Sequence, residues 1–130
     1  GARRFGQHYE YILFFVKDKK NFKFRKESLD SIIDYKIDNL TEIGNVWNIH
    51  KKAGSVGKGV PHPALYPVEM IRRIIKASTD KTDIVLDPFL GSGTTTLAAM
   101  ELSRHSIGYE LNKKDYKPLI ENRIKNNILV

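Results

Sequence analysis

The sequence has no cysteine and no long apolar run. A chain without cysteine forms neither disulfide bonds nor thiolate metal sites, and it is compatible with a reducing cytosol. The longest apolar run covers residues 11–16, which is strand-sized and far below the ~20 residues of a transmembrane helix. The chain does not open with the pattern of a secretory signal. These absences exclude a disulfide framework and give no sign of a membrane span.

The histidines do not suggest a metal site either. His8, His50 and His105 have no metal-ligand spacing to one another or to carboxylates, whereas a zinc site needs such clustered ligands. We therefore expect no metal.

The positive charge lies mostly in the first half. The net charge is +7, and residues 1–60 carry twelve Lys or Arg against seven Asp or Glu. Such a surface suits phosphate contact, but lysine-rich surfaces are common, so charge alone leaves nucleic acid and plain solvation equally open. Several of these basic residues lie close together in the sequence and are our candidates for DNA binding. They are Lys19, Lys20, Lys23, Arg25, Lys51, Lys52 and Lys58.

The length and periodicity predict one α/β domain over residues 1–130. Apolar stretches predict an N-terminal β-hairpin, and further strands of the core. Apolar residues at helical spacing predict the helices, and residues 37–61 read mostly as loop. The expected strands are 9–16, 21–26, 84–86 and 107–110, and the expected helices are 28–36, one starting at Pro67, 94–103 and 115–126.

A glycine-rich turn follows the strand at 84–86. It reads Asp87-Pro88-Phe89-Leu90-Gly91-Ser92-Gly93-Thr94, and a helix-forming segment follows it. Strand, glycine turn and helix in this order are typical of a nucleotide-cofactor loop, because glycine lets backbone approach a ligand. An acidic residue, Glu110, comes at the end of the next strand, near the interval at which a carboxylate binds ribose hydroxyls.

Three interpretations compete for this turn. A P-loop requires a lysine beside the last glycine, and none is present. A dinucleotide fingerprint requires a third glycine where the chain has Thr96. The third interpretation, an ordinary turn in which Asp87 only caps the loop, explains neither the preceding Asp-Pro-Phe nor Glu110.

The turn resembles the S-adenosylmethionine motif of DNA methyltransferases that modify exocyclic amino groups, the N4-cytosine and N6-adenine enzymes. Two further segments are similar to motifs of that family: His62-Pro63-Ala64-Leu65-Tyr66-Pro67 and Ile107-Gly108-Tyr109-Glu110. Residues 8–17 and 45–49 resemble segments late in its catalytic half. The order of these matches is that of the permuted subgroup, in which the catalytic half comes first.

This resemblance implies part of a Rossmann-like S-adenosylmethionine-dependent methyltransferase sheet, with residues 61–130 as the cofactor-binding half. It also implies double-stranded DNA as a partner and a prokaryotic, nucleoid-associated location. The cofactor-binding residues that it implies are His62, Pro63, Ala64, Tyr66, Asp87, Phe89, Gly91, Ser92, Gly93, Thr94 and Glu110.

One family feature is missing. The catalytic tetrapeptide of these enzymes contains Pro-Pro followed by an aromatic residue, and none of the five prolines here adjoins another. No catalytic residue is therefore expected in this chain. Two strands of the family's sheet would also be absent, leaving exposed edges. We expect a partner polypeptide that carries the tetrapeptide, or self-association. The alternatives are a non-catalytic DNA-binding or scaffold protein with a degenerate methyltransferase fold, and an RNA methyltransferase subunit.

Overall fold

The computed structural model describes residues 9–25, 45–47, 49 and 66–126. Their helices and strands alternate, as the sequence predicts for an α/β chain. In chain order the elements are α1 (Val68–Ser78), β1 (Ile84–Asp87), α2 (Thr94–Glu101), β2 (His105–Gly108) and α3 (Lys113–Asn126). No helix in this described part combines the length and apolar character needed to cross a membrane.

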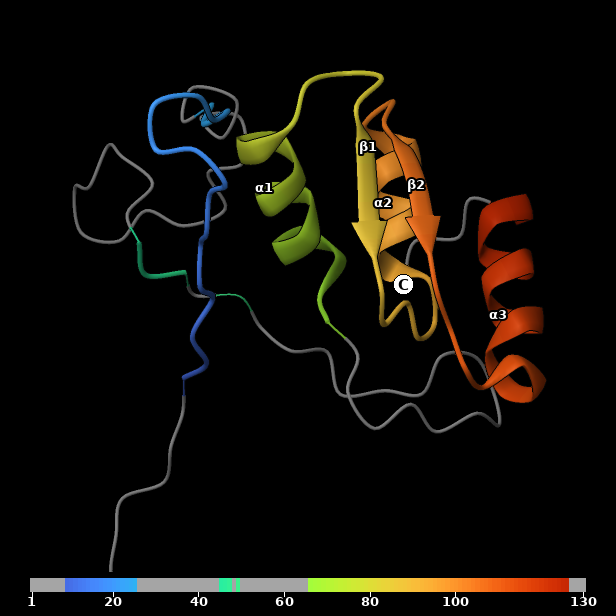
Figure 1. Cartoon of the computed structure of the whole chain (residues 1–130). Helices are drawn as coiled ribbons and strands as arrows, with labels where there is room; N and C mark the ends of the chain where they lie inside the picture. Colours follow the sequence, from blue (N-terminus) through green and yellow to red (C-terminus); the bar gives the residue numbers. More distant parts are fainter. Residues whose placement is uncertain (1–8, 26–44, 48, 50–65, 127–130) are drawn as a thin grey trace, which may run out of the picture.

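The two strands lie side by side and run in the same direction. Ile84 pairs with His105, and Asp87 pairs with Gly108. The connection from β1 to β2 passes through α2, which lies behind the strands in Figure 1. Because parallel strands end at one edge of a sheet, the segments that follow β1 and β2 meet there.

A small core joins α1, α2 and one face of the sheet. Ile75 of α1 and the adjacent Ala98 and Ala99 of α2 are at most 2% exposed. The two alanines let the helices pack closely, and Val85 of β1 contacts this cluster from the sheet. The core therefore fixes α2, and with it the glycine turn that opens this helix.

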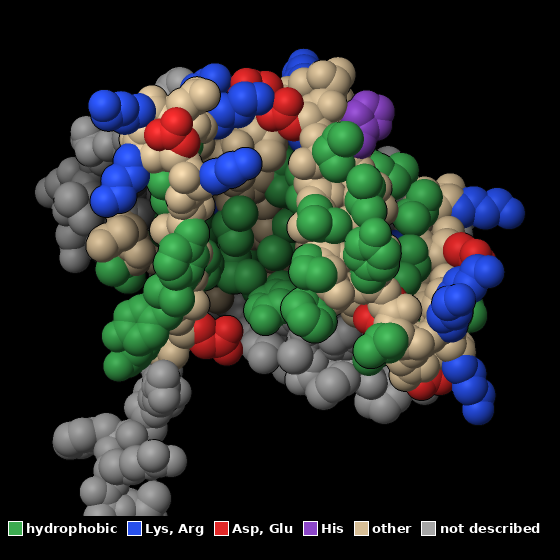
Figure 2. All heavy atoms as spheres, in the orientation of Figure 1, with side chains coloured by type: hydrophobic (Ala, Val, Ile, Leu, Met, Phe, Trp, Pro, Cys, Tyr) green, Lys and Arg blue, Asp and Glu red, His purple; other side chains and the backbone are tan. Residues whose placement is uncertain are grey.

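The opposite face of the sheet is uncovered in the described structure. All three helices lie behind or beside the strands (Figure 1), and hydrophobic side chains face outward over the strands in Figure 2. Ile84, Leu86 and Ile107 point to this side and are 63%, 61% and 47% exposed. Alternate residues of the two strands thus present an apolar face without a covering layer.

From residue 66 onward the predicted boundaries agree with the structure within one residue, except for three elements that shift by two residues. The helix expected after Pro67 is α1. The second strand begins at His105 and ends at Gly108, so Glu110 lies two residues beyond it. The last helix begins at Lys113 because Asn112 caps it: its side-chain oxygen accepts the Asp115 amide at 3.2 Å. The helix expected at 94–103 is α2, and it ends at Glu101 rather than at residue 103.

The predicted N-terminal β-hairpin is not formed as a pair of strands. Residues 9–25 contain a turn, in which the Asn21 amide donates to the Asp18 carbonyl at 3.3 Å, but no strand ladder. Phe14 packs against Phe22 and Phe24 across this turn. An isolated hairpin is marginally stable without further strands, and no strand of the described sheet adjoins this one. The helix expected at 28–36 lies outside the described residues.

The end of this N-terminal segment is attached to the amino edge of the sheet. The Arg25 amide donates to the Ala77 carbonyl at the end of α1, at 2.7 Å. The Lys23 ammonium pairs with Asp83 and, at 3.1 Å, with Asp80. The segment therefore lies against the turn between α1 and β1, at the edge opposite the glycine turn.

Candidate cofactor-binding site

The glycine turn and Glu110 meet at the carboxyl edge of the sheet. The turn leaves β1 at Asp87 and enters α2 at Thr94, and Glu110 follows β2. The Leu90 amide donates to the Tyr109 carbonyl at 2.9 Å, which ties the turn to the segment after β2. The structure thus brings together the two motifs that the sequence places 23 positions apart.

Glu110 is held in place by two backbone amides. One of its carboxylate oxygens accepts the Gly91 amide at 2.8 Å, and the other accepts the Asn112 amide at 2.7 Å. A carboxylate has about four acceptor positions, so two remain for a ligand. The side chain is fixed and keeps the capacity to accept two further hydroxyl groups.

Several backbone amides of the turn already have hydrogen-bond partners within the chain. The Phe89 amide donates to the Asp87 carboxylate at 2.9 Å, the Gly91 amide to Glu110, and the Gly93 amide to the Leu90 carbonyl at 3.0 Å. These three amides of the turn are therefore already used and are not free to bind an anion. With them used internally and no lysine within the turn itself, the turn lacks the donors of a phosphate-binding loop.

The two glycines of the turn are required by its geometry. Gly91 and Gly93 have φ values of 54° and 85°, in the left-handed region that favours glycine. A Cβ at Gly93 would also lie 3.2 Å from the Ile120 side chain of α3. Close packing against α3, in addition to the positive φ, thus favours glycine at position 93.

Arg123 of α3 is a site residue that the sequence interpretation missed. Its Nη1 donates to the Ser92 carbonyl at 2.9 Å, to the Ser92 hydroxyl at 3.0 Å and to the Thr94 hydroxyl at 3.2 Å. Burial lowers the pKa of this guanidinium from its ordinary value. A signal was present: Arg123 lies four residues after Leu119 and three after Ile120, on the predicted apolar face of the helix.

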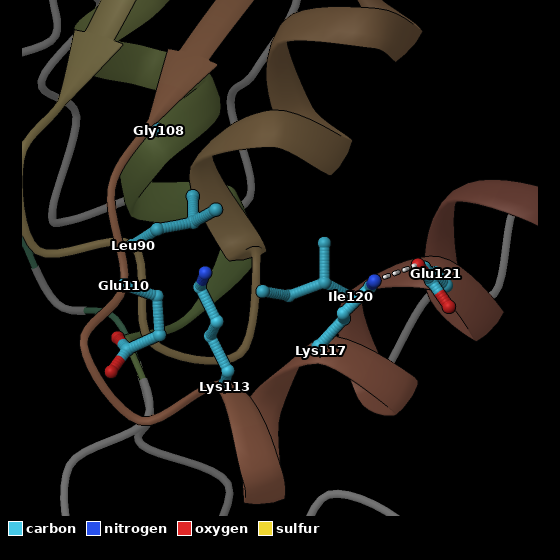
Figure 3. A pocket seen from close by; sticks show the side chains of 7 residues that line it. All are labelled: Leu90, Gly108, Glu110, Lys113, Lys117, Ile120 and Glu121. Atoms are coloured by element: carbon cyan, nitrogen blue, oxygen red, sulfur yellow. Dashed lines mark ion pairs between the residues drawn. The ribbon is translucent and has the colours of Figure 1, made fainter.

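An open cavity of about 320 Å³ adjoins Glu110 between the turn and α3. Figure 3 shows its residues, with Leu90, Glu110 and Lys113 on one side and the side chains of Lys117, Ile120 and Glu121 on the other. Lys117 and Glu121 form an exposed ion pair at its rim, at 3.7 Å. No group of three metal-ligating side chains occurs among the residues that the structure describes.

Two other predicted cofactor residues are exposed in this structure. Tyr66 and Phe89 are 56% and 88% exposed, so both side chains remain accessible at the surface. His62, Pro63 and Ala64 lie outside the described residues.

The predicted DNA-binding residues fall into three groups. Lys19 and Lys20 are exposed. Lys23 and Arg25 pair with carboxylates, and these hydrogen bonds raise the pKa of Lys23 and lower that of Asp83. Lys51, Lys52 and Lys58 lie outside the described residues.

Comparison with known proteins identifies the family. The family model described as DNA methylase, that of N6- and N4-directed methyltransferases, matches residues 1–122. This chain belongs to that family. The match covers both the segment of residues 9–25 and the glycine turn.

Two curated methylases illustrate the relationship. The chain is 35% identical over 130 residues to the DNA adenine methyltransferase YhdJ of Escherichia coli, an alignment that covers 88% of this chain and 44% of YhdJ. It is 42% identical over 123 residues to the type II methyltransferase M.MjaI of Methanocaldococcus jannaschii, covering 88% of this chain and 38% of that protein. The chain therefore spans less than half the length of either methylase.

Solved structures agree with the α/β assignment. The M1.HpyAVI–SAM complex aligns with a TM-score of 0.60 and 30% identity, over 83% of this chain and 46% of that one. PvuII DNA methyltransferase, described as cytosine-N4-specific, aligns with a TM-score of 0.57 over 82% of this chain and 43% of that one, at 23% identity, and supports the fold alone. The Rossmann-like fold expected for this chain is thereby confirmed.

Proposed function

We propose that this chain is the S-adenosylmethionine-binding portion of a DNA methyltransferase that modifies an exocyclic amino group, N4 of cytosine or N6 of adenine. The observation that carries this proposal is the Glu110 carboxylate held against the glycine turn at the carboxyl edge of the sheet. A carboxylate in this place suits ribose hydroxyls. A partner polypeptide would supply the catalytic Pro-Pro-aromatic motif.

The residues present fit this cofactor. S-adenosylmethionine has a ribose, an ammonium and a sulfonium but no phosphate. The site offers two carboxylates, Asp87 and Glu110, and no lysine within the turn. Glu110 would hold the ribose through its two remaining acceptor positions, and the turn of Gly91–Gly93 would form a wall without a side chain in the way. When bound, the cofactor supplies a methyl group already activated by the sulfonium.

The remaining task of such an enzyme is orientation. The partner polypeptide would hold the target base turned out of the duplex, with its amino nitrogen facing the methyl group that the bound cofactor would supply. The amino group gives up one proton, which an acceptor in the partner polypeptide or the solvent would take. This chain would fix the cofactor, and the partner would fix the base.

The uncovered apolar face supports the need for a partner. Ile84, Leu86 and Ile107 lie exposed on a sheet of two strands, and the outer edge of β1 has no neighbouring strand in the described structure. Figure 2 shows a hollow with hydrophobic side chains between the N-terminal segment and these strands. A covering polypeptide would bury this face and pair the edge.

Glu110 provides the direct test of the cofactor site. We expect Glu110→Ala to weaken cofactor binding by about 1–3 kcal/mol, because two hydroxyl acceptors are lost and the Gly91 amide is freed. Glu110→Gln keeps one oxygen for the Gly91 amide and should weaken binding less. The measurement is a calorimetric titration with S-adenosylmethionine.

The matched control is Glu121→Ala, which removes an exposed carboxylate at the rim of the same cavity. It should leave affinity unchanged. If Glu110→Ala and the unaltered chain bind S-adenosylmethionine with equal affinity, Glu110 does not hold the ribose.

DNA binding should depend on salt through the exposed lysines of the N-terminal segment. We expect Lys19→Gln with Lys20→Gln to reduce the slope of log affinity against log salt by about 0.9 for each phosphate that the chain no longer neutralises. Lys23 and Arg25 are left intact, because their ion pairs hold the segment to the α1–β1 turn. The measurement is a series of titrations with duplex DNA at increasing salt.

A variant of equal charge change, Lys114→Gln with Lys125→Gln, serves as the control, since both lysines are exposed on α3. Its slope should equal that of the unaltered chain. If the two double variants give the same slope, the N-terminal basic residues face something other than DNA.

A further inference from the structure

Arg123 connects α3 to the glycine turn from behind. It is 5% exposed, and its Nη1 reaches both Ser92, the central residue of the turn, and Thr94, the first residue of α2. One guanidinium nitrogen thus joins three acceptors on the two sides of Gly93. The contact spans 31 positions of sequence.

Structural stability alone is a poor account of this residue. No carboxylate of the described residues pairs with the guanidinium, and its Nε has no hydrogen-bond partner among them. A buried charge without a counter-charge is costly, and an apolar side chain at such a position is often as stabilising or more so. Among the described residues, the hydrogen bonds of Arg123 go to Ser92 and Thr94 of the glycine turn.

The turn needs such support because of its backbone. Gly91 and Gly93 both adopt left-handed conformations, so Ser92 lies between two residues that have no Cβ to restrict their backbone dihedral angles. Glu110 holds the turn at Gly91, and Arg123 holds it at Ser92. Release of Ser92 would let the Gly91 amide move away from the Glu110 carboxylate.

We propose that Arg123 is a positioning residue for cofactor binding. By holding Ser92 and Thr94, its guanidinium keeps the glycine turn and the Glu110 carboxylate in one arrangement. This inference rests on the proposed cofactor site.

The test compares Arg123→Met and Arg123→Lys with Arg104→Met. Arg104 is a matched control because its guanidinium also makes three hydrogen bonds, to Thr79 and Leu102, but at the opposite edge of the sheet. Two quantities are measured: the dissociation constant for S-adenosylmethionine, and the amide hydrogen exchange of residues 91–94 without cofactor.

We expect Arg123→Met to weaken binding by about tenfold and to speed exchange in the turn, because the Ser92 carbonyl and both hydroxyls lose their donor. Arg123→Lys should recover part of the affinity, since an ammonium can still donate to Ser92. Arg104→Met should lower the midpoint of thermal unfolding without changing the dissociation constant or exchange in the turn.

Unchanged affinity and unchanged exchange in the Arg123 variants would overturn the inference while leaving the cofactor site intact. If the unaltered chain binds no S-adenosylmethionine, the proposed function fails, and the exchange measurement still decides whether Arg123 holds the turn. Should Arg123→Met not fold, Arg123→Lys gives the same two readouts.

Discussion

The purified chain alone is expected to transfer no methyl group to DNA, and a partner that carries the Pro-Pro-aromatic tetrapeptide is expected to restore transfer. The chain has no Pro-Pro dipeptide with which to hold the target amino group. Methyl transfer should be present with the partner and absent without it. Tighter cofactor binding does not replace the residues that hold the target amino group. The measurement is incorporation of tritiated methyl groups into duplex DNA.

The same experiment has a physical readout. With Ile84, Leu86 and Ile107 exposed on one face, the isolated chain should self-associate or dissolve poorly. Addition of the partner should yield one compact complex of defined mass by size-exclusion chromatography with light scattering. The two readouts should change together.

A suitable control is the complex of the partner with the Glu110→Ala chain. It should assemble normally, because Glu110 lies at the carboxyl edge and outside the exposed apolar face, yet transfer methyl groups more slowly at limiting cofactor. Methyl incorporation by rigorously partner-free chain would contradict the requirement for a partner.

Gly93→Val is expected to have the largest effect of any single substitution in the turn. Valine at a φ of 85° is strained, and its Cβ would lie 3.2 Å from Ile120. Left-handed strain of about 1–2 kcal/mol and overpacking of about 1–3 kcal/mol together remove a large fraction of a typical domain stability of about 5–15 kcal/mol. Thermal unfolding and cofactor titration should both show the loss.

The two causes can be separated with smaller changes. Gly93→Ala carries both the strain and the contact, whereas Gly93→Ala combined with Ile120→Ala relieves the contact and keeps the strain. A double-mutant cycle should therefore give a coupling energy of about 0.5–3 kcal/mol between the two positions. Additive effects would show that Ile120 does not limit the side chain at position 93.

The sequence was sufficient to predict the glycine turn and Glu110 because both follow strands whose parallel order brings their ends together. It could not reveal that Glu110 would bond the Gly91 amide, since that depends on the exact separation of two chain segments. Arg123 was missed for a related reason: its acceptors lie about 30 residues earlier, and no local pattern joins them.

The N-terminal segment shows the opposite failure. Alternating aromatic residues predicted a hairpin, and the turn and the packing of Phe14 on Phe22 did form. The ladder did not form, because strand pairing in a sheet depends on neighbouring strands and no strand of the described residues adjoins this segment. The DNA-binding role of Lys23 and Arg25 stays a prediction, but the sequence could not show that Asp80 and Asp83, more than 50 positions away, pair with them.

The bond between the Gly91 amide and Glu110 also bears on selectivity. Because the turn satisfies these amides before any ligand arrives, the pocket is preorganised and binding requires little rearrangement. A nucleoside triphosphate, which shares the adenosine of the proposed cofactor, would find few free amides in the turn for its phosphates. The turn would therefore give a triphosphate little of the backbone anchoring that phosphate-binding loops supply, and selection against ATP would follow from the turn's own hydrogen bonds.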